Sequence, residues 1–177
     1  MEIKIIELQP QDINEVKELA ALVIKDSFHN DGVAHKYKKY LSEEIIRVQK
    51  KFDQDQKENY YFLIAKENNK VVGTAGYALK IAGPIQLALN QLQLSDKSVV
   101  ELISFYIHPQ HQGKGIGPKL LKALLTHLKQ ADYQYFSLYT GYQKAKDFWR
   151  KKLGEPDVIL PKYFEKSLDC HVWVKPI

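Results

Sequence analysis

A glycine-rich turn between an apolar run and a leucine-rich segment is the part of this sequence best suited to bind a ligand. The turn reads QGKGIG, from Gln112 to Gly117, with glycines at 113, 115 and 117. The first N–H groups of a helix lack intrahelical partners and carry the positive end of the helix dipole, so they attract anions. Glycine has no Cβ and lets the backbone approach a ligand closely. The turn therefore predicts a phosphate or pyrophosphate site.

Two familiar phosphate motifs do not fit this turn. A Walker loop needs Ser or Thr after its Gly-Lys pair, but Gly115 follows Lys114 here. The dinucleotide fingerprint G-x-G-x-x-G needs one residue more than the spacing of these glycines provides. A nucleotide hydrolase is therefore set aside.

One carboxylate lies inside the apolar run that precedes the turn. Glu101 is the only acidic residue in SVVELISFYI, residues 98–107. In a buried strand a carboxylate takes up protons more readily, because desolvation disfavours its charged form. That property suits a general base that works near neutral pH. The alternative is that Glu101 lies at a strand end and remains in solvent.

These candidate groups need a strand before the turn and a helix after it. Residues 99–107 are apolar, β-branched and aromatic, which predicts a buried strand that ends at His108-Pro109. After the turn, leucines at helical spacing predict a helix with one buried face, at Leu120, Leu121, Leu124, Leu125 and Leu128.

The rest of the chain alternates between strand and helix patterns. Periodicity predicts helices over 13–28, 34–51 and 145–153 and strands over 3–8, 60–65, 71–78, 135–139, 158–160 and 170–174. The order strand, helix, strand around the glycine turn predicts a parallel crossover.

Local signals refine this outline. Asp12 and Glu15 form a D-x-x-E pattern, which predicts a capping box at the first helix. Asn68-Asn69 predicts a tight hairpin turn, and the glycines of 71–78 predict a close backbone approach within a strand.

Residues 80–97 have the least readable pattern. The alternation of Ile85, Leu87 and Leu89 is typical of a short strand, whereas the leucines up to Leu94 also suit a lid over the site. Because the segment is long for a connection, we expect it to shape an acceptor pocket.

Composition limits the class of protein. A chain of 177 residues with 45% hydrophobic and 27% charged residues suits one globular domain, residues 1–177. No apolar run approaches the roughly 20 residues of a membrane span, and no signal peptide is visible. Cys170 is the only cysteine, lies in an apolar run and is expected to be buried rather than nucleophilic. These features lead us to expect a cytoplasmic protein without membrane contact.

Charge and ligand spacing point away from two other classes. The net charge of +5 is modest, and the lysines are scattered rather than grouped with aromatics, so we expect no nucleic-acid partner. The histidines lack metal-ligand spacing, so we expect no metal site.

The stretch ELISFYIHPQHQGKGIGPKLL resembles the coenzyme-A-binding segment of the GCN5-related N-acetyltransferase (GNAT) superfamily. The shared pattern is Q-x-x-G-x-G at the start of a helix, with Glu101 in the strand before it. The resemblance is strong over residues 98–128 and weaker over 59–79 and 141–154. It implies an α/β fold with a mixed, mostly antiparallel sheet around the strand, glycine turn and helix.

The same resemblance implies acetyl-coenzyme A (acetyl-CoA) as the cofactor. Backbone groups of Phe105 and Ile107 would pair with the pantetheine amides, and the turn would hold the pyrophosphate. The implied cofactor-binding residues are Phe105, Ile107, Gln112, Gly113, Lys114, Gly115, Ile116, Gly117, Tyr142 and Trp149. Glu101 falls where family members often carry their general base.

The general acid departs from the family pattern. The superfamily often has a tyrosine four residues after the alanine of an N-x-x-A motif, and here Trp149 stands four residues after Ala145. An indole N–H donates a hydrogen bond but does not give up its proton. The asparagine of that motif falls on Tyr142, which is our candidate acid, with water or unassisted departure of the thiolate as alternatives.

The resulting expectation is an N-acetyltransferase that moves an acetyl group from acetyl-CoA to a primary amine of a small molecule or peptide. The alternative is a non-catalytic acyl-CoA-binding or regulatory domain, which the tryptophan at 149 favours. The acceptor stays open among polyamines, amino acids, antibiotics and protein N-termini. The oligomeric state also stays open, a homodimer included.

Overall fold

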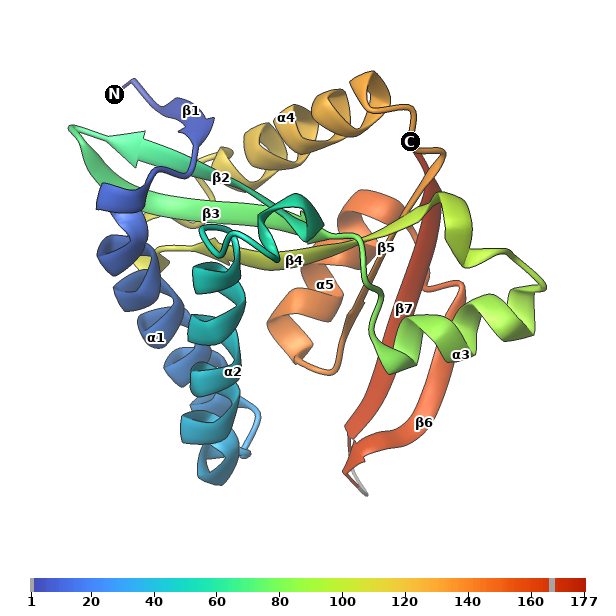
Figure 1. Ribbon diagram of the computed structural model, residues 1–177. Helices are drawn as coiled ribbons and strands as arrows, with labels where there is room; N and C mark the ends of the chain where they lie inside the picture. The colour runs from blue at the N-terminus through green and yellow to red at the C-terminus, as the bar shows by residue number, and fades with distance from the viewer. Residues whose placement is uncertain (1, 166–167) are drawn as a thin grey trace. The chain divides into compact units, whose positions relative to one another are not determined.

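The computed structural model describes residues 2–165 and 168–177 of the chain and shows alternating strands and helices (Figure 1). In chain order the strands and α-helices are β1 (Lys4–Glu7), α1 (Ile13–Asn30), α2 (Tyr37–Lys50), β2 (Tyr60–Glu67), β3 (Lys70–Ala78), α3 (Gly83–Leu92), β4 (Val99–Ile107), α4 (Ile116–Gln130), β5 (Tyr135–Thr140), α5 (Gln143–Leu153), β6 (Val158–Glu165) and β7 (Leu168–Pro176).

Within the described residues, seven strands form one sheet in the order β1-β2-β3-β4-β5-β7-β6. Strands β4 and β5 run parallel, with Val99 beside Tyr135 and Glu101 beside Ser137. The pairs β1–β2, β2–β3, β5–β7 and β6–β7 run antiparallel. The sheet is therefore mixed and mostly antiparallel as expected, and the predicted parallel crossover through α4 is confirmed.

The chain forms two compact units, and β4 contributes to both. The first unit contains residues 2–78 and 103–127, with the glycine turn and the end of β4. The second contains residues 79–102, 128–165 and 168–177, with Glu101 and the start of β4. Each unit buries its own apolar cluster.

In the first unit, helices α1 and α2 lie side by side (Figure 1). Their apolar positions, together with those of the strands, form a core of Leu8, Val16, Leu19, Val48, Phe62, Ile64, Val71, Ala78 and Ile103. This cluster buries the period-3.6 face of each helix, as amphipathic helices require.

The β2–β3 hairpin confirms two predictions from the sequence. Asn68 and Asn69 have φ angles of 49° and 64°, and positive values at both central residues are what a type I′ turn requires. A Cβ on Gly76 would lie 2.5 Å from the carbonyl oxygen of Tyr61. Only glycine permits this backbone approach.

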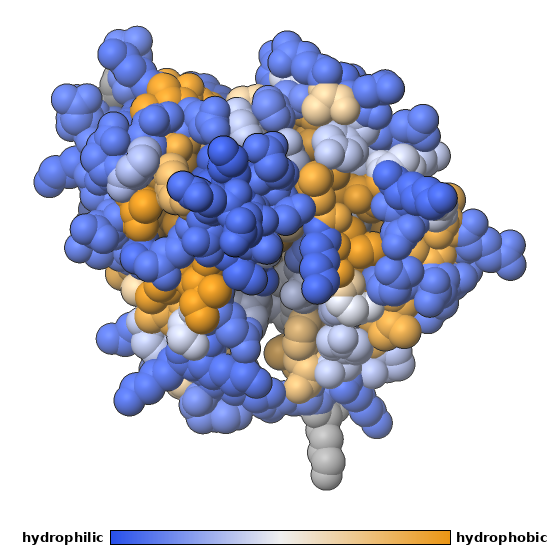
Figure 2. Space-filling model, in the orientation of Figure 1, coloured by the Kyte–Doolittle hydropathy of each residue, from blue (hydrophilic) through white to orange (hydrophobic). Residues whose placement is uncertain are grey.

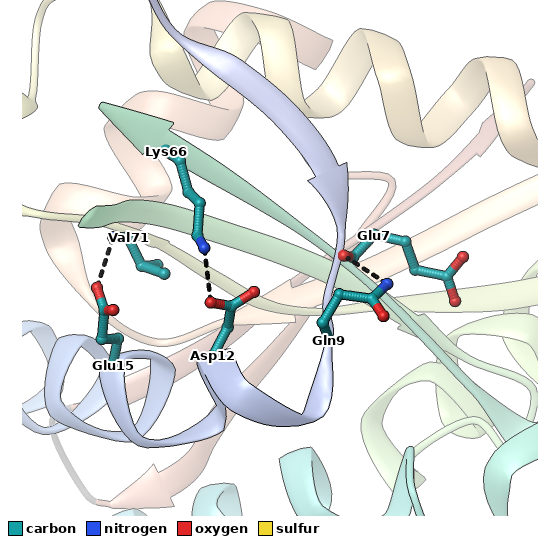
Figure 3. A network of polar contacts seen from close by, with 6 residues as sticks. All are labelled: Glu7, Gln9, Asp12, Glu15, Lys66 and Val71. Atoms are coloured by element: carbon teal, nitrogen blue, oxygen red, sulfur yellow. Dashed lines mark hydrogen bonds and ion pairs between the residues drawn. The ribbon is translucent and has the colours of Figure 1, made fainter. Parts of the chain in front are cut away.

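The predicted capping box is wrong. The side chain of Asp12 makes no cap hydrogen bond; its Oδ1 lies 2.6 Å from Nζ of Lys66 on β2. The Glu15 carboxylate accepts a hydrogen bond from the N–H of Val71 on β3, at 2.8 Å. Figure 3 shows both carboxylates turned toward the strands. They tie the start of α1 to the hairpin instead of closing the helix end.

The short strand expected at residues 85–89 is also wrong, because residues 83–92 form helix α3. Ile85, Ala88 and Leu89 are fully buried in the second unit at helical spacing, whereas Leu87 is 45% exposed. Pro84 stands in the first turn, where its missing N–H breaks no helical bond. The alternation of apolar residues therefore does not reflect a strand. Burial of Ile85, Ala88 and Leu89 against the core of the second unit stabilises the helix instead.

Cys170 of β7 is buried in the second unit, as the sequence predicted. Burial raises the pKa of its thiol to about 12, although the positive charge of Lys146 lowers it in part. At neutral pH the thiol is therefore protonated and serves as a small apolar side chain.

The described residues contain no helix that combines the length and apolarity needed to cross a bilayer. On the face shown in Figure 2, hydrophilic residues predominate and apolar residues form separate patches.

His171 of β7 is expected to make stability fall at acidic pH. It is 6% exposed and its Nδ1 has no hydrogen-bond partner. Burial first, and then the positive charges of Lys146 and Arg150, lower the pKa of His171, while Asp169 and Glu155 raise it in part. Below about pH 6.5, the ordinary pKa of histidine, His171 is protonated in the unfolded chain but stays neutral in the folded chain. The stability present above about pH 6.5 is therefore lost as pH falls.

The measurement is the free energy of unfolding by denaturant at several pH values. One such proton gives a slope of at most about 1.4 kcal/mol per pH unit. His171→Asn should flatten the dependence below pH 6.5 in part. Equal slopes in the wild type and His171→Asn would contradict the expectation.

Candidate functional site

The glycine turn forms the predicted anion-binding geometry. Gly113 and Gly115 have φ angles of +75° and +79°, in the left-handed region that glycine enters without strain. A Cβ at either position would meet no atom within 4 Å, so backbone conformation alone requires glycine there. Residues 112–115 are exposed, and α4 begins directly afterwards at Ile116.

The amides of this turn are unpaired. Within the described chain, the N–H groups of residues 113–117 donate to no protein acceptor. The first bond of α4 is donated by the N–H of Lys119 to the carbonyl of Gly115, at 3.3 Å. Pro118 has no N–H. A row of backbone donors at a helix N-terminus is thus available to an anion.

Side chains hold the turn against the neighbouring strands. Nε2 of Gln112 donates to the carbonyl of Ile107 at 3.1 Å, which joins the turn to the end of β4. Nε2 of His111 lies 3.0 Å from Oε2 of Glu67 at the end of β2. Sequence reasoning assigned Gln112 only a backbone role, and it missed the side-chain contact because that contact depends on the turn's path.

Two lysines and one carboxylate line a cavity beside the turn. The first turn of α4 contains no acidic residue. Lys114 and Lys119 line a surface cavity of about 260 Å³ together with Ile3, Glu67 and Ile116. The side chain of Ile116 is 2% exposed, so this residue offers a ligand its N–H rather than its side chain.

The end of β4 is distorted next to the predicted pantetheine-pairing residues. Phe105 and Ile107 are half-buried. Ser104 just before them has φ +54°, a left-handed conformation that is uncommon for a non-glycine residue inside a strand. No glycine or asparagine marks this position in the sequence, so pattern analysis missed it.

Glu101 lies inside the second unit and is 4% exposed, so the expected burial is confirmed and the solvated alternative is excluded. Its Oε2 accepts a hydrogen bond from the N–H of Ala82 at 2.6 Å. Ala82 is the N-cap of α3, so the carboxylate binds the positive end of that helix. The sequence did not predict this contact.

Both candidate residues of α5 lie in the second unit, with Tyr142 at the N-cap and Trp149 within the helix. Tyr142 is the half-buried N-cap, and its N–H donates to Oγ1 of Thr140 at 3.1 Å. Trp149 is 6% exposed and packs edge-on against Phe148, with ring centroids 4.8 Å apart. The structure thus places the turn, Phe105 and Ile107 in the first unit and the candidate acid and base in the second.

A buried carboxylate on α2 was missed by sequence reasoning. Glu44 is 2% exposed and contacts Ser104 at the distortion of β4. A signal for it existed: Glu44 stands between Leu41 and Val48 at helical spacing, on the apolar face of α2. A charge at such a position predicts a buried partner.

Comparison with known families decides the class of this protein. The model of the acetyltransferase (GNAT) family matches residues 27–154, which is more than half of the chain. The chain belongs to the GNAT family of acetyltransferases. The matched range includes β4, the glycine turn and α5. The resemblance noted in the sequence is therefore confirmed.

Solved N-acetyltransferases share the fold over nearly the whole chain. An N-acetyltransferase from Staphylococcus aureus Mu50 has a TM-score of 0.69 at 16% identity, and 99% of each chain is covered. The PaiA N-acetyltransferase from Thermoplasma acidophilum, solved in complex with coenzyme A, has a TM-score of 0.67 at 17% identity, with 99% of this chain and 100% of that chain covered.

A third similar structure is the ribosomal-protein-S18-alanine N-acetyltransferase from Escherichia coli. Its TM-score is 0.64 at 16% identity, with 99% of this chain and 94% of that chain covered. Compared by sequence, curated proteins give no significant match. At these identities the similarity shows the fold and does not identify the acceptor.

Proposed function

We propose that this GNAT protein transfers an acetyl group from acetyl-CoA to the amine of a small molecule or peptide. The observation that carries the proposal is the row of unpaired N–H groups from Gly113 to Gly117 at the start of α4. A diphosphate fits this site, because it would accept hydrogen bonds from these N–H groups, approach the glycine backbone closely and lie near two lysines. The similar PaiA N-acetyltransferase was solved in complex with coenzyme A, which supports the same ligand.

The glycine turn and the end of β4 have different roles in binding the cofactor. The N–H groups of residues 113–117 hold the pyrophosphate, with Lys114 and Lys119 adding charge, whereas the N–H of Gln112 is donated to the carbonyl of Pro109 at 3.3 Å. Backbone groups of Phe105 and Ile107 pair with the pantetheine arm as an added strand would. Gln112 keeps the Ile107 carbonyl in place through its 3.1 Å hydrogen bond.

The chemistry needs a proton acceptor and a proton donor. Acetyl-CoA supplies an acetyl thioester, whose C–S bond breaks as the new C–N bond forms. An alkyl amine with a pKa of about 10.4 is mostly protonated at pH 7, and its deprotonation costs about 4 to 5 kcal/mol. Glu101 accepts this proton, directly or through water, and the Tyr142 hydroxyl gives a proton to the departing sulfur.

The test of the proposed function is release of free thiol from acetyl-CoA across a panel of amines. The panel contains polyamines, amino acids, aminoglycoside antibiotics and peptides with free N-termini. Turnover with any one class supports an N-acetyltransferase and names its acceptor. Calorimetric binding of CoA without turnover on any amine supports a non-catalytic acyl-CoA-binding domain, the reading favoured by Trp149. Absence of CoA binding contradicts both functions.

Tyr142→Phe is expected to lower kcat by about 10²-fold without changing CoA affinity. The backbone contacts of residue 142 with Thr140 and Lys146 do not involve the hydroxyl, so α5 should begin unchanged. The measurements are steady-state kinetics and calorimetry with CoA. Tyr163→Phe, at an exposed position of β6, is the matched control. A Tyr142→Phe enzyme as fast as the wild type would exclude this residue as the acid.

A further inference from the structure

The buried carboxylate of Glu44 has no role in the proposed chemistry. Glu44 lies on α2, is 2% exposed and receives three hydrogen bonds: from Nη1 of Arg47 at 3.1 Å, from Oγ of Ser104 and from the side chain of Tyr106. Burial raises the pKa of the Glu44 carboxyl, and Arg47, Ser104 and Tyr106 lower it in part. An apolar residue would fill the same site without a desolvation cost, so packing alone does not explain a carboxylate here.

Two of the three donors come from the distorted part of β4. Ser104 and Tyr106 flank Phe105, and Ser104 carries the left-handed φ of +54°. Such a conformation is strained for an L-residue and persists only where surrounding contacts enforce it. The carboxylate of Glu44 supplies these contacts, because it accepts from the side chains on both sides of Phe105.

The distortion decides how the end of β4 presents its backbone. Side chains and backbone groups alternate along a regular strand, so a local kink re-aims every group that follows it. Phe105 follows Ser104 directly, and Ile107 lies two residues beyond Phe105. Relaxation of Ser104 to an extended conformation would rotate the N–H and C=O groups that the pantetheine arm needs.

We propose that Glu44 is a positioning residue that holds the kink of β4 at Ser104 and thereby orients the backbone of Phe105 and Ile107 for coenzyme A. The inference rests on the proposed function, since it concerns the same ligand. Glu44 acts through β4 and does not touch the cofactor. Gln112 fixes the other end of the same segment through the Ile107 carbonyl.

The first test is calorimetric titration of the full chain with CoA, together with the melting temperature of each variant. Glu44→Gln should raise the Kd for CoA about tenfold. Glutamine is uncharged, and its NH₂ group cannot accept a hydrogen bond, so at least one of the three donors loses its acceptor. Val48→Ala is the matched control: Val48 lies one turn further along α2, is 1% exposed and packs in the apolar core that also contains Ile103, but its side chain has no polar atom that could accept from Ser104. It should lower the melting temperature and leave the Kd unchanged.

The second test uses position 104 itself and remains available if Glu44→Gln folds poorly. Ser104→Ala loses the hydroxyl and keeps the strain, so its Kd should rise about as much as that of Glu44→Gln. Ser104→Gly loses the hydroxyl but enters the left-handed region freely, so its Kd should stay closer to the wild type. In the Glu44→Gln background, Ser104→Gly should restore part of the lost affinity.

A purely structural role gives a different pattern. If Glu44→Gln lowers the melting temperature but leaves the Kd for CoA unchanged, as Val48→Ala does, the positioning role is overturned. It is also overturned if Ser104→Ala and Ser104→Gly bind CoA equally well. A wild-type protein that binds no CoA overturns the proposed function instead, which a loss confined to the variants does not.

Discussion

Glu101→Gln is expected to lower kcat by about 10²- to 10³-fold while folding and CoA affinity stay intact, because glutamine cannot take the proton of the amine. Its amide oxygen still accepts from the N–H of Ala82, as Oε2 of Glu101 does at 2.6 Å. The start of α3 should therefore be preserved. The measurement is the pH dependence of kcat/KM, whose acid limb should flatten in the variant.

Two control variants distinguish a role of Glu101 as general base from a role as a hydrogen-bond acceptor at the start of α3. Glu101→Ala removes both functions and leaves the Ala82 N–H without its acceptor, which costs about 1 to 3 kcal/mol of stability. Glu155→Gln, at an exposed carboxylate whose side chain is 78% accessible, should change neither rate nor profile. If Glu101→Gln is as active as the wild type and only Glu101→Ala is impaired, Glu101 serves α3 and takes no part in proton transfer.

Gly115→Ala is expected to raise the Kd for CoA about tenfold, because a left-handed φ costs an L-residue about 1 to 2 kcal/mol. Gly115 has φ +79°, and a Cβ added there would meet nothing within 4 Å, so the effect comes from conformation and not from a clash. A turn that avoids this conformation no longer aligns its N–H groups. Calorimetry with CoA measures the change directly.

The first unit offers a matched control for this substitution. Gly32 lies outside the turn, has φ +71° and also has nothing within 4 Å of a Cβ. Gly32→Ala should therefore lose a similar amount of stability while the Kd for CoA stays at the wild-type value. Equal affinities of both variants would mean that the turn does not hold the diphosphate.

Much of the fold around the turn was predictable because its causes are local. Asn68 and Asn69 tolerate the left-handed conformation that the hairpin turn requires, and both adopt it. Gly113 and Gly115 behave in the same way within the turn. The burial of Glu101 also followed from its apolar neighbours along the strand.

Errors arose where distant partners overrode a local pattern. The D-x-x-E spacing of Asp12 and Glu15 suits a capping box, but the partners are Lys66 and Val71, 54 and 56 residues away along the chain. Residues 85–89 alternate as a strand does, but the core of the second unit accepts only the face formed by Ile85, Ala88 and Leu89.

The strand, the glycine turn and the helix that carry the family resemblance could be predicted from adjacent residues, because backbone freedom and helix-end polarity are local properties. The group that each buried carboxylate binds became visible only in the folded chain. Ala82 donates to Glu101 across 19 residues and Ser104 donates to Glu44 across 60, and no local pattern encodes such pairs. The physical reason is that burial removes water from a charge, and the donor that replaces the water comes from whichever element the fold packs beside it.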